Sequence, residues 1–385
     1  MAKSTSALET PLRDQLDRLA AFEPTDAPVL SLYLDMRPDG QGSRGRYESF
    51  LRKAFADRAR GLTGDRRKSF DRDVERITLY LENELQPSTN GVAIIACSAA
   101  NNFFEALQLG VPLEQSWLFI GSVPHLYPLA RLNDQYPRYA ALLVDTNSAR
   151  LFVFGLGVTE GHYAVKNVKT RKSSMGGWSQ ARYQRHLSNF HLHHTKEVVD
   201  VLDRVVREES ISKIIVACEP STQAMLMEQM PKHLQEKVVD VVHLDINTPE
   251  HQVLTETLEA MREKDAQTDA ERVERLFNAW HSDGLGVVGP EDTMDALAKA
   301  QVEELLIAAT PALVRRAAQL PAELRAGTIQ VDTSAANVSI DPQQVQFADD
   351  LVTRAQQQSA RIRFIEDPAL LSEVGGVGAI LRFKL

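Results

Sequence analysis

Short apolar runs that alternate with amphipathic helical patterns constrain the fold of this chain more than any other feature. Residues 139–145 and 150–154 are two such runs, and the small and polar residues at 146–149 between them predict a β-hairpin. A helical pattern follows from about Ser179, and residues 213–218 then form the pattern of a buried strand. Strands, a helix and a further strand in this order predict a mixed α/β layer.

The length of 385 residues is sufficient for two or three domains. We expect an N-terminal α/β domain at residues 1–136, a middle domain at 137–248 and a C-terminal α/β domain at 282–385. Residues 249–281 predict a helix that connects the last two domains, because Thr248 is a suitable cap and a proline follows it. The centre of this helix is polar and charged, as expected of a connector.

The composition is that of an ordinary soluble globular protein, with 43% hydrophobic and 25% charged residues. No stretch approaches the about 20 apolar residues that cross a bilayer. Residues 1–11 lack the apolar core of a secretory signal. The two cysteines, Cys97 and Cys218, each lie in an apolar strand-like run, which indicates thiols in a reducing compartment. We therefore expect a cytoplasmic protein that is not bound to a membrane.

Positive charge is concentrated in one part of an acidic chain. The net charge is −9, yet residues 161–196 contain no aspartate or glutamate, carry +7 and hold five of the ten histidines. The remainder of the chain therefore carries −16. The basic side chains of this stretch are Lys166, Lys169, Arg171, Lys172, Arg182, Arg185 and Lys196. A local basic segment predicts one defined contact with a polyanion, and the alternative is a solvated basic surface.

The helical pattern within this stretch has an apolar and a polar face. The apolar stripe, spaced by three and four residues, consists of Tyr183, Leu187, Phe190, His194, Val198, Val201 and Val205. The opposite face, which can line phosphates, consists of Arg182, His186, Asn189, His193 and Lys196. A small, glycine-containing segment at residues 173–179 precedes the helix. We interpret this segment as a loop carried at the tip of a basic helix, and the alternative is an ordinary strand-to-helix turn.

Residues 176–185, Gly-Gly-Trp-Ser-Gln-Ala-Arg-Tyr-Gln-Arg, resemble the GGQ loop and helix of the archaeal and eukaryotic class-1 release factors. Without gaps, the positions that match the family pattern are Gly176, Gly177, Ser179, Arg182, Tyr183 and Arg185. Trp178 occupies the position of the family's catalytic glutamine, and Gln180 follows two residues later. A related eukaryotic ribosome-rescue hydrolase also carries its glutamine displaced from the double glycine.

Two further blocks resemble the same family in the same order. Residues 289–297 with 302–307 resemble the start of the family's third domain, and residues 375–383 resemble its end in both the release factors and Pelota. The resemblance covers about Arg138 to the C-terminus and implies a three-domain α/β architecture of the release-factor/Pelota type. The middle domain would be RNase-H-like, and the C-terminal domain would resemble kink-turn-binding ribosomal proteins. The bacterial branch of the superfamily includes the Balon-like ribosome hibernation factors.

The resemblance implies a translation factor that binds the A site of idle or stalled ribosomes, in hibernation or rescue. Gly176 and Gly177, with Trp178 and Ser179, would approach the peptidyl-transferase centre, where Trp178 could stack on a base. The C-terminal domain would contact a GTPase of the elongation-factor type. Residues 1–136 contain no Asn-Ile-Lys-Ser codon-reading loop, so stop-codon decoding by the family's means is not expected. The expected RNA contacts are Lys166, Lys169, Arg171, Lys172, Arg182, Arg185, His186, His193 and Lys196.

Two alternative functions remain. In the first, the protein hydrolyses the ester of peptidyl-tRNA: the backbone of Gly176 and Gly177 would stabilise the reacting groups, and Gln180 would help to position water. In the second, the protein binds another structured RNA.

A second basic cluster lies in the N-terminal segment, diluted by acids at Glu48, Asp57 and Asp65. It indicates either a second rRNA contact or a charged helix surface. Its candidate residues are Arg44, Arg46, Arg52, Lys53, Arg66, Arg67 and Lys68.

Neither a cofactor nor a metal is predicted. Residues 284–289 fit the GxGxxG pattern, but a long polar helix precedes them instead of the strand that a dinucleotide site needs. His191 and His194 are one helical turn apart, but no cysteine or acid completes a zinc set. A packed or RNA-facing histidine is the better interpretation. A Ser-His-Asp triad cannot be assembled from the sequence.

Overall fold

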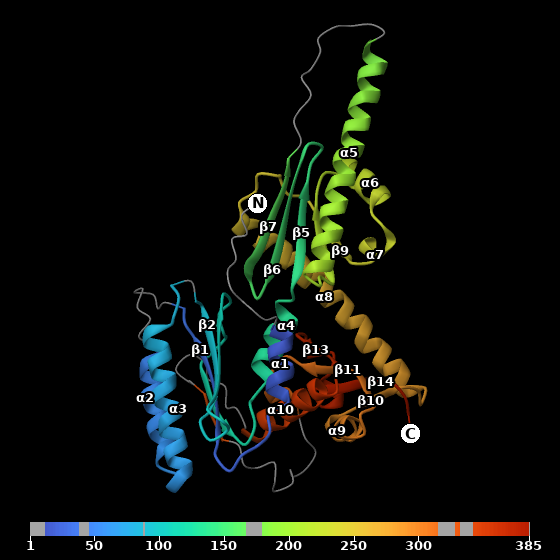
Figure 1. The fold of residues 1–385 in the computed structure, drawn as a ribbon. Helices are drawn as coiled ribbons and strands as arrows, with labels where there is room; N and C mark the ends of the chain where they lie inside the picture. The colour runs from blue at the N-terminus through green and yellow to red at the C-terminus, as the bar shows by residue number, and fades with distance from the viewer. Residues whose placement is uncertain are drawn as a thin grey trace. The chain divides into compact units, whose positions relative to one another are not determined.

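The computed structural model describes residues 12–37, 46–87, 89–166, 179–314, 328–331 and 342–384 (Figure 1). Within these ranges, side chains are described except at residues 46, 166, 179–189, 312, 328–331 and 342–344. The chain divides into two compact units. Unit 1 includes Tyr136–Gln267, and unit 2 combines Thr10–Gln135 with Thr268–Leu385. The described residues form three β-sheets with accompanying helices, which confirms a mixed α/β fold.

Unit 1 is built on a five-stranded sheet of order β7-β6-β5-β8-β9. Its first three strands are antiparallel neighbours, whereas β8 pairs with β5 and β9 in parallel. The hairpin predicted at 139–154 is confirmed, and its turn is closed by Asp145, whose Oδ1 accepts the N–H groups of Asn147 and Ser148. The strands are β5 (Tyr139–Val144), β6 (Ser148–Gly155), β7 (Val158–Lys166), β8 (Lys213–Ala217) and β9 (Val238–Val242).

Both faces of this sheet are covered, because residues of β5 alternate between two separate apolar cores. Ala140 and Leu142 pack in the core formed with α5 (Ser179–Glu208), α6 (Pro220–Gln229) and α7 (Lys232–Gln235). Tyr139 and Leu143 pack in the core that includes Val253 and Met261 of α8 (Glu250–His281). The long helix α5 is therefore one layer of unit 1, and the beginning of α8 is another.

Unit 2 contains an antiparallel sheet of order β12-β4-β1-β2-β3. The helices α2 (Arg46–Ala59) and α3 (Gly64–Asn83) pack against it, and residues 60–63 separate them (Figure 1). Two shorter helices of this region are α1 (Leu12–Ala20) and α4 (Tyr127–Gln135). The strands are β1 (Val29–Asp35), β2 (Gly91–Cys97), β3 (Phe103–Leu109), β4 (Trp117–Gly121) and β12 (Thr328–Val331).

The second sheet of unit 2 has the order β10-β14-β11-β13. Its strands are β10 (Gly286–Val288), β11 (Val302–Ala308), β13 (Arg361–Ile365) and β14 (Val377–Leu381). The helices α9 (Pro290–Ala298) and α10 (Pro342–Gln357) and two 3-10 turns, Pro311–Leu313 and Ser372–Val374, accompany it. Gly376 adopts a φ of +81°, and a Cβ there would lie 2.5 Å from the Leu313 carbonyl oxygen. The glycine pair before β14 is therefore required by the backbone.

Helix α8 belongs to both units, because its residues up to Gln267 lie in unit 1 and those from Thr268 lie in unit 2. It covers the positions at which the sequence predicts a connecting helix. The domain boundaries that the sequence suggests stay a prediction, since unit 2 takes in both the first and the last segment of the chain. None of the described helices is long and apolar enough to cross a membrane.

Candidate nucleic-acid interface

Helix α5 is fixed in unit 1 by its C-terminal half. Val198, Leu202 and Val205 are at most 1% exposed and belong to the core beneath the sheet. Among the described side chains of α5, burial begins at His194. The helix has 30 residues, and at about 1.5 Å per residue it spans roughly 45 Å. Its N-terminal half extends beyond the edge of the sheet of its own unit (Figure 1).

His194 attaches α5 to the β5–β6 turn. Its ring is 1% exposed and forms hydrogen bonds with the backbone at Ser148 and Asp145. Burial lowers the pKa of His194, and these hydrogen bonds partly oppose the effect. His194 is therefore a packed histidine of the apolar stripe. In the part of the chain that the structure describes, no group of three or more His, Cys, Asp or Glu side chains could hold a metal ion.

The sequence-predicted contacts of the basic stretch divide into three groups. His193 and Lys196 are exposed on α5, so their side chains are available to a partner. Lys166 ends β7, and Ser179, Gln180, Arg182, Arg185 and His186 lie on α5, but their side chains lie outside the described ones. The remaining positions lie outside the described residues, namely Lys169, Arg171, Lys172, Gly176, Gly177 and Trp178.

The C-terminal end of α5 is held to the sheet by the Arg138 guanidinium, which has two carboxylate partners. Arg138, just before β5, donates to Glu160 of β7 at 2.5 Å and to Glu209, just after α5, at 2.7 Å. All three side chains are between 19% and 31% exposed, so solvent screens these pairs only in part. Local sequence patterns do not reveal this support, because Glu160 and Glu209 lie 22 and 71 residues from Arg138.

Helix α8 is held within each unit by polar contacts. In unit 1, Lys213 Nζ lies 3.1 Å from Asp265 Oδ1, and the hydroxyls of Tyr139 and Thr257 lie 2.8 Å apart. Arg150 of β6 donates to the carbonyls of Ile246 and Thr248, which precede the helix. These contacts fix the beginning of α8 to the sheet that also supports α5.

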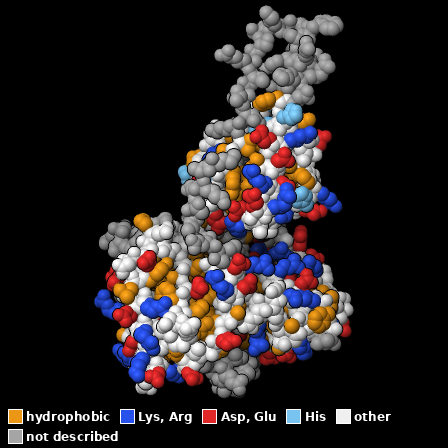
Figure 2. Space-filling model, viewed as in Figure 1, with side chains coloured by type: hydrophobic (Ala, Val, Ile, Leu, Met, Phe, Trp, Pro, Cys, Tyr) orange, Lys and Arg blue, Asp and Glu red, His pale blue; other side chains and the backbone are white. Residues whose placement is uncertain are grey.

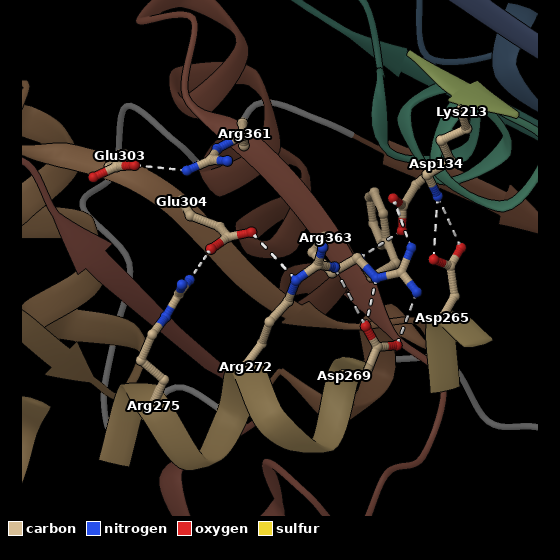
Figure 3. Close-up of polar contacts among 11 residues, drawn as sticks. Asp134, Lys213, Asp265, Asp269, Arg272, Arg275, Glu303, Glu304, Arg361 and Arg363 are labelled. Atoms are coloured by element: carbon tan, nitrogen blue, oxygen red, sulfur yellow. Dashed lines mark hydrogen bonds and ion pairs between the residues drawn. The ribbon is translucent and has the colours of Figure 1, made fainter. Parts of the chain in front are cut away.

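In unit 2, α8 carries buried ion pairs (Figure 3). Arg363 of β13 donates to both oxygens of Asp269, at 2.6 and 3.0 Å, and also lies 3.1 Å from Asp134. Arg363 and Asp269 are 8% and 5% exposed. Six residues further along α8, Arg275, whose side chain is 59% exposed, donates to the buried Glu304 of β11 at 2.7 Å. Because breaking a buried pair leaves an uncompensated charge, these contacts fix the position of α8 in its unit.

The N-terminal basic cluster is divided between α2 and α3. Arg52 and Lys53 are exposed on α2, and Arg46 begins that helix, though its side chain is not among those described. On α3, Arg66 is exposed and Arg67 and Lys68 form ion pairs with Asp71 and Asp65. Arg44 lies outside the described residues. Figure 2 shows basic and acidic side chains interleaved at the lower left, where Figure 1 has α2 and α3.

The glycines at residues 284–289 serve packing. Strand β10 begins within this motif, and a Cβ on Gly286 would lie 2.6 Å from the backbone nitrogen of Trp280 on α8. The two cysteines are free and buried, and burial raises the pKa of the Cys218 thiol to about 11. A thiol with such a pKa stays protonated at neutral pH and is a poor nucleophile.

Two family models match the chain, and both describe release factors. Residues 124–262 match "Bacterial archaeo-eukaryotic release factor family 10", and residues 266–385 match "eRF1 domain 3". Over these two regions the chain is similar to the bacterial archaeo-eukaryotic release factors and to the third domain of eRF1, which confirms the resemblance drawn from the sequence. No curated protein matches the chain.

Several solved structures are similar to this chain at low sequence identity. An archaeal translation termination factor, aRF1, is 15% identical, with 97% of each chain covered and a TM-score of 0.27. S. cerevisiae Dom34, described as interacting with Hbs1, is 10% identical, with 77% of this chain and 79% of that chain covered and a TM-score of 0.43. Archaeal Pelota, in a ribosome-bound model with ABCE1, is 12% identical, with 100% and 96% covered and a TM-score of 0.42.

Proposed function

We propose that this chain is a translation factor that binds the A site of idle or stalled ribosomes, as in hibernation or rescue. The observation that carries the proposal is the match of residues 124–262 to the bacterial release factors, because these residues include all of α5 and the segment that leads into it. The match of residues 266–385 to eRF1 domain 3 extends the likeness to the C-terminus. In this proposal, the C-terminal domain contacts a GTPase of the elongation-factor type.

The geometry of α5 supports an approach into RNA. Its C-terminal half is packed in the core and secured through Arg138, so the helix can act as a rigid support for what precedes it. The acid-free stretch at residues 161–196 ends on this helix with the exposed Lys196, and Glu197 and Asp200 follow. Phosphates would therefore be attracted to the N-terminal half of α5 and repelled beyond it. We propose that Gly176 and Gly177 are directed to the peptidyl-transferase centre, a role that rests on the sequence resemblance.

Neutralisation of Lys196 tests this interface. We expect Lys196→Gln to weaken co-sedimentation with ribosomes and to lower the slope of log affinity against log salt by about 1, since one phosphate contact is lost. The matched control is Lys232→Gln on α7, an exposed lysine of the same unit that lies 3.7 Å from Glu236. It should bind like the wild type. Failure of the wild type to co-sediment at low salt would overturn the proposal.

Similarity to a release-factor family also supports a second function, the hydrolysis of peptidyl-tRNA. Ribosomes that carry peptidyl-tRNA separate the two functions, because release of the peptide reports hydrolysis directly. We expect binding without release, since Trp178 stands at the position of the family's catalytic glutamine. Release by the wild type that is lost in Gln180→Ala, with binding unchanged, would instead establish the hydrolase.

A further inference from the structure

The outward face of α2 lacks both acidic and large apolar side chains. Leu51 and Ala54 are 8% and 3% exposed and belong to the core under the N-terminal sheet. At about 100° per residue, the positions opposite this buried face are Ser49, Arg52, Lys53 and Ala56, and all four are exposed. The two acids of the helix, Glu48 and Asp57, lie at the margins of this face. We call these four residues the α2 face.

The two neighbouring helices differ in charge. From Arg46 to Arg60 the chain has five basic and two acidic residues, whereas α3 has five of each. The bases of α3 are also paired locally: Arg67 lies 2.8 Å from Asp71, and Lys68 lies 2.9 Å from Asp65. With other described residues, neither Arg52 nor Lys53 forms an ion pair. The positive potential of this helical hairpin therefore arises mainly from α2.

The chemistry of the α2 face fits a polyanion. Ser49 and Ala56, which lie beside the two cations, are small and let a phosphate backbone approach closely. No large hydrophobic side chain is exposed on this face. In the described part of this hairpin, the exposed large hydrophobic residue is Leu79, which belongs to α3. Arg52 and Lys53 are adjacent in sequence but point about 100° apart, so they can reach two different phosphates.

We propose that the α2 face, with Arg52 and Lys53, is a second RNA-binding surface that contacts the phosphate backbone of ribosomal RNA, and that α3 takes no part in it. This inference rests on the proposed ribosomal function and divides the sequence-predicted cluster in two. Arg66, Arg67 and Lys68, which the sequence places in one patch with Arg52 and Lys53, then belong to a charge-balanced helix surface. Phosphate contacts of this kind position a protein without reading a base sequence.

Two double variants of equal net charge test the inference. Arg52→Gln with Lys53→Gln removes two charges from α2, and Lys68→Gln with Arg72→Gln removes two charges from exposed positions of α3. We expect the α2 double variant to bind ribosomes about tenfold more weakly and to lower the slope of log affinity against log salt by about 2, while the α3 double variant changes affinity less than about twofold. Equal thermal unfolding temperatures would show that both variants are folded.

The outcomes are distinguishable. An equal loss in both double variants would mean that only net charge matters, and wild-type binding by the α2 variant would mean that the face is not used; either result overturns the inference but leaves the ribosomal function standing. Failure of the wild type to bind ribosomes would instead overturn the proposed function. In that event, a double-stranded RNA oligonucleotide tests the face independently, because the α2 variant must bind it more weakly than the α3 variant if the inference holds.

Discussion

Asp349 and Asp350 are adjacent buried carboxyl groups of α10, but in the described part of the chain only Asp349 accepts hydrogen bonds from backbone N–H groups of another element. Asp349 of α10 is fully buried, and its Oδ1 accepts the N–H groups of Leu126 and Tyr127 at 2.7 and 2.8 Å and lies 3.0 Å from His125 Nδ1. Asp350 is 8% exposed and receives a hydrogen bond from Gln346 at 3.1 Å. Burial, and then the charge of Asp349, raise the pKa of Asp350 to about 7. Asp349 holds the start of α4, whereas Asp350 is costly to ionise.

This arrangement predicts a pH dependence of stability. The unfolded protein releases the Asp350 proton near pH 4, and the folded protein releases it near pH 7. Between these values the folded state binds more protons, so the free energy of unfolding falls as the pH rises through this window. The loss is at most about 4 kcal/mol, at about 1.4 kcal/mol per pH unit.

Asp350→Asn should remove this loss, because the amide stays neutral at every pH. We expect the difference in free energy of unfolding between pH 5 and pH 8, measured by urea denaturation, to be smaller in the variant than in the wild type. The control Asp349→Asn should be less stable at both pH values, since it weakens an acceptor of two backbone N–H groups. An unchanged pH difference in Asp350→Asn would contradict the assignment.

At the scale of elements, local patterns were sufficient where a structure depends on neighbouring residues. The β5–β6 hairpin and α5 follow from turn chemistry and from apolar spacing. The burial of His194 follows from the same stripe. Pairing over long sequence distances was beyond these patterns. Strand β12 pairs with β4, about 210 residues earlier, and only the folded chain brings them together.

The candidate interface was predictable to a different degree at each position. The acid-free stretch identified α5 as basic, but exposure of His193 and Lys196 could be established only from the packing of the helix. The N-terminal cluster was predicted as one patch, because the sequence alone does not say which bases are paired with acids. Ion pairs on α3 and their absence among the described residues for Arg52 and Lys53 separate the two helices. Charge pairing is a tertiary property even when the residues are close in sequence.

At the scale of the whole molecule, the boundary between the two family matches lies close to the boundary between the two compact units. The matches adjoin within α8, at residues 262 and 266, and the compact units divide at Gln267 and Thr268 of the same helix. Each unit has apolar cores of its own, for example around β5 in unit 1 and around β1 in unit 2. A multidomain protein of this kind need not unfold in one step. We therefore expect calorimetry to resolve two unfolding transitions, one for each unit.

Two substitutions on α8 assign these transitions. Asp269→Ala leaves the buried Arg363 without its bidentate partner and should destabilise the transition of unit 2 by about 3–5 kcal/mol. Asp265→Ala makes the same chemical change one helical turn earlier, where the contact with Lys213 is 18% to 29% exposed, and should cost unit 1 no more than about 1 kcal/mol. A single transition that both variants shift equally would show that the two units unfold together, because α8 would then transmit a local loss to the whole molecule.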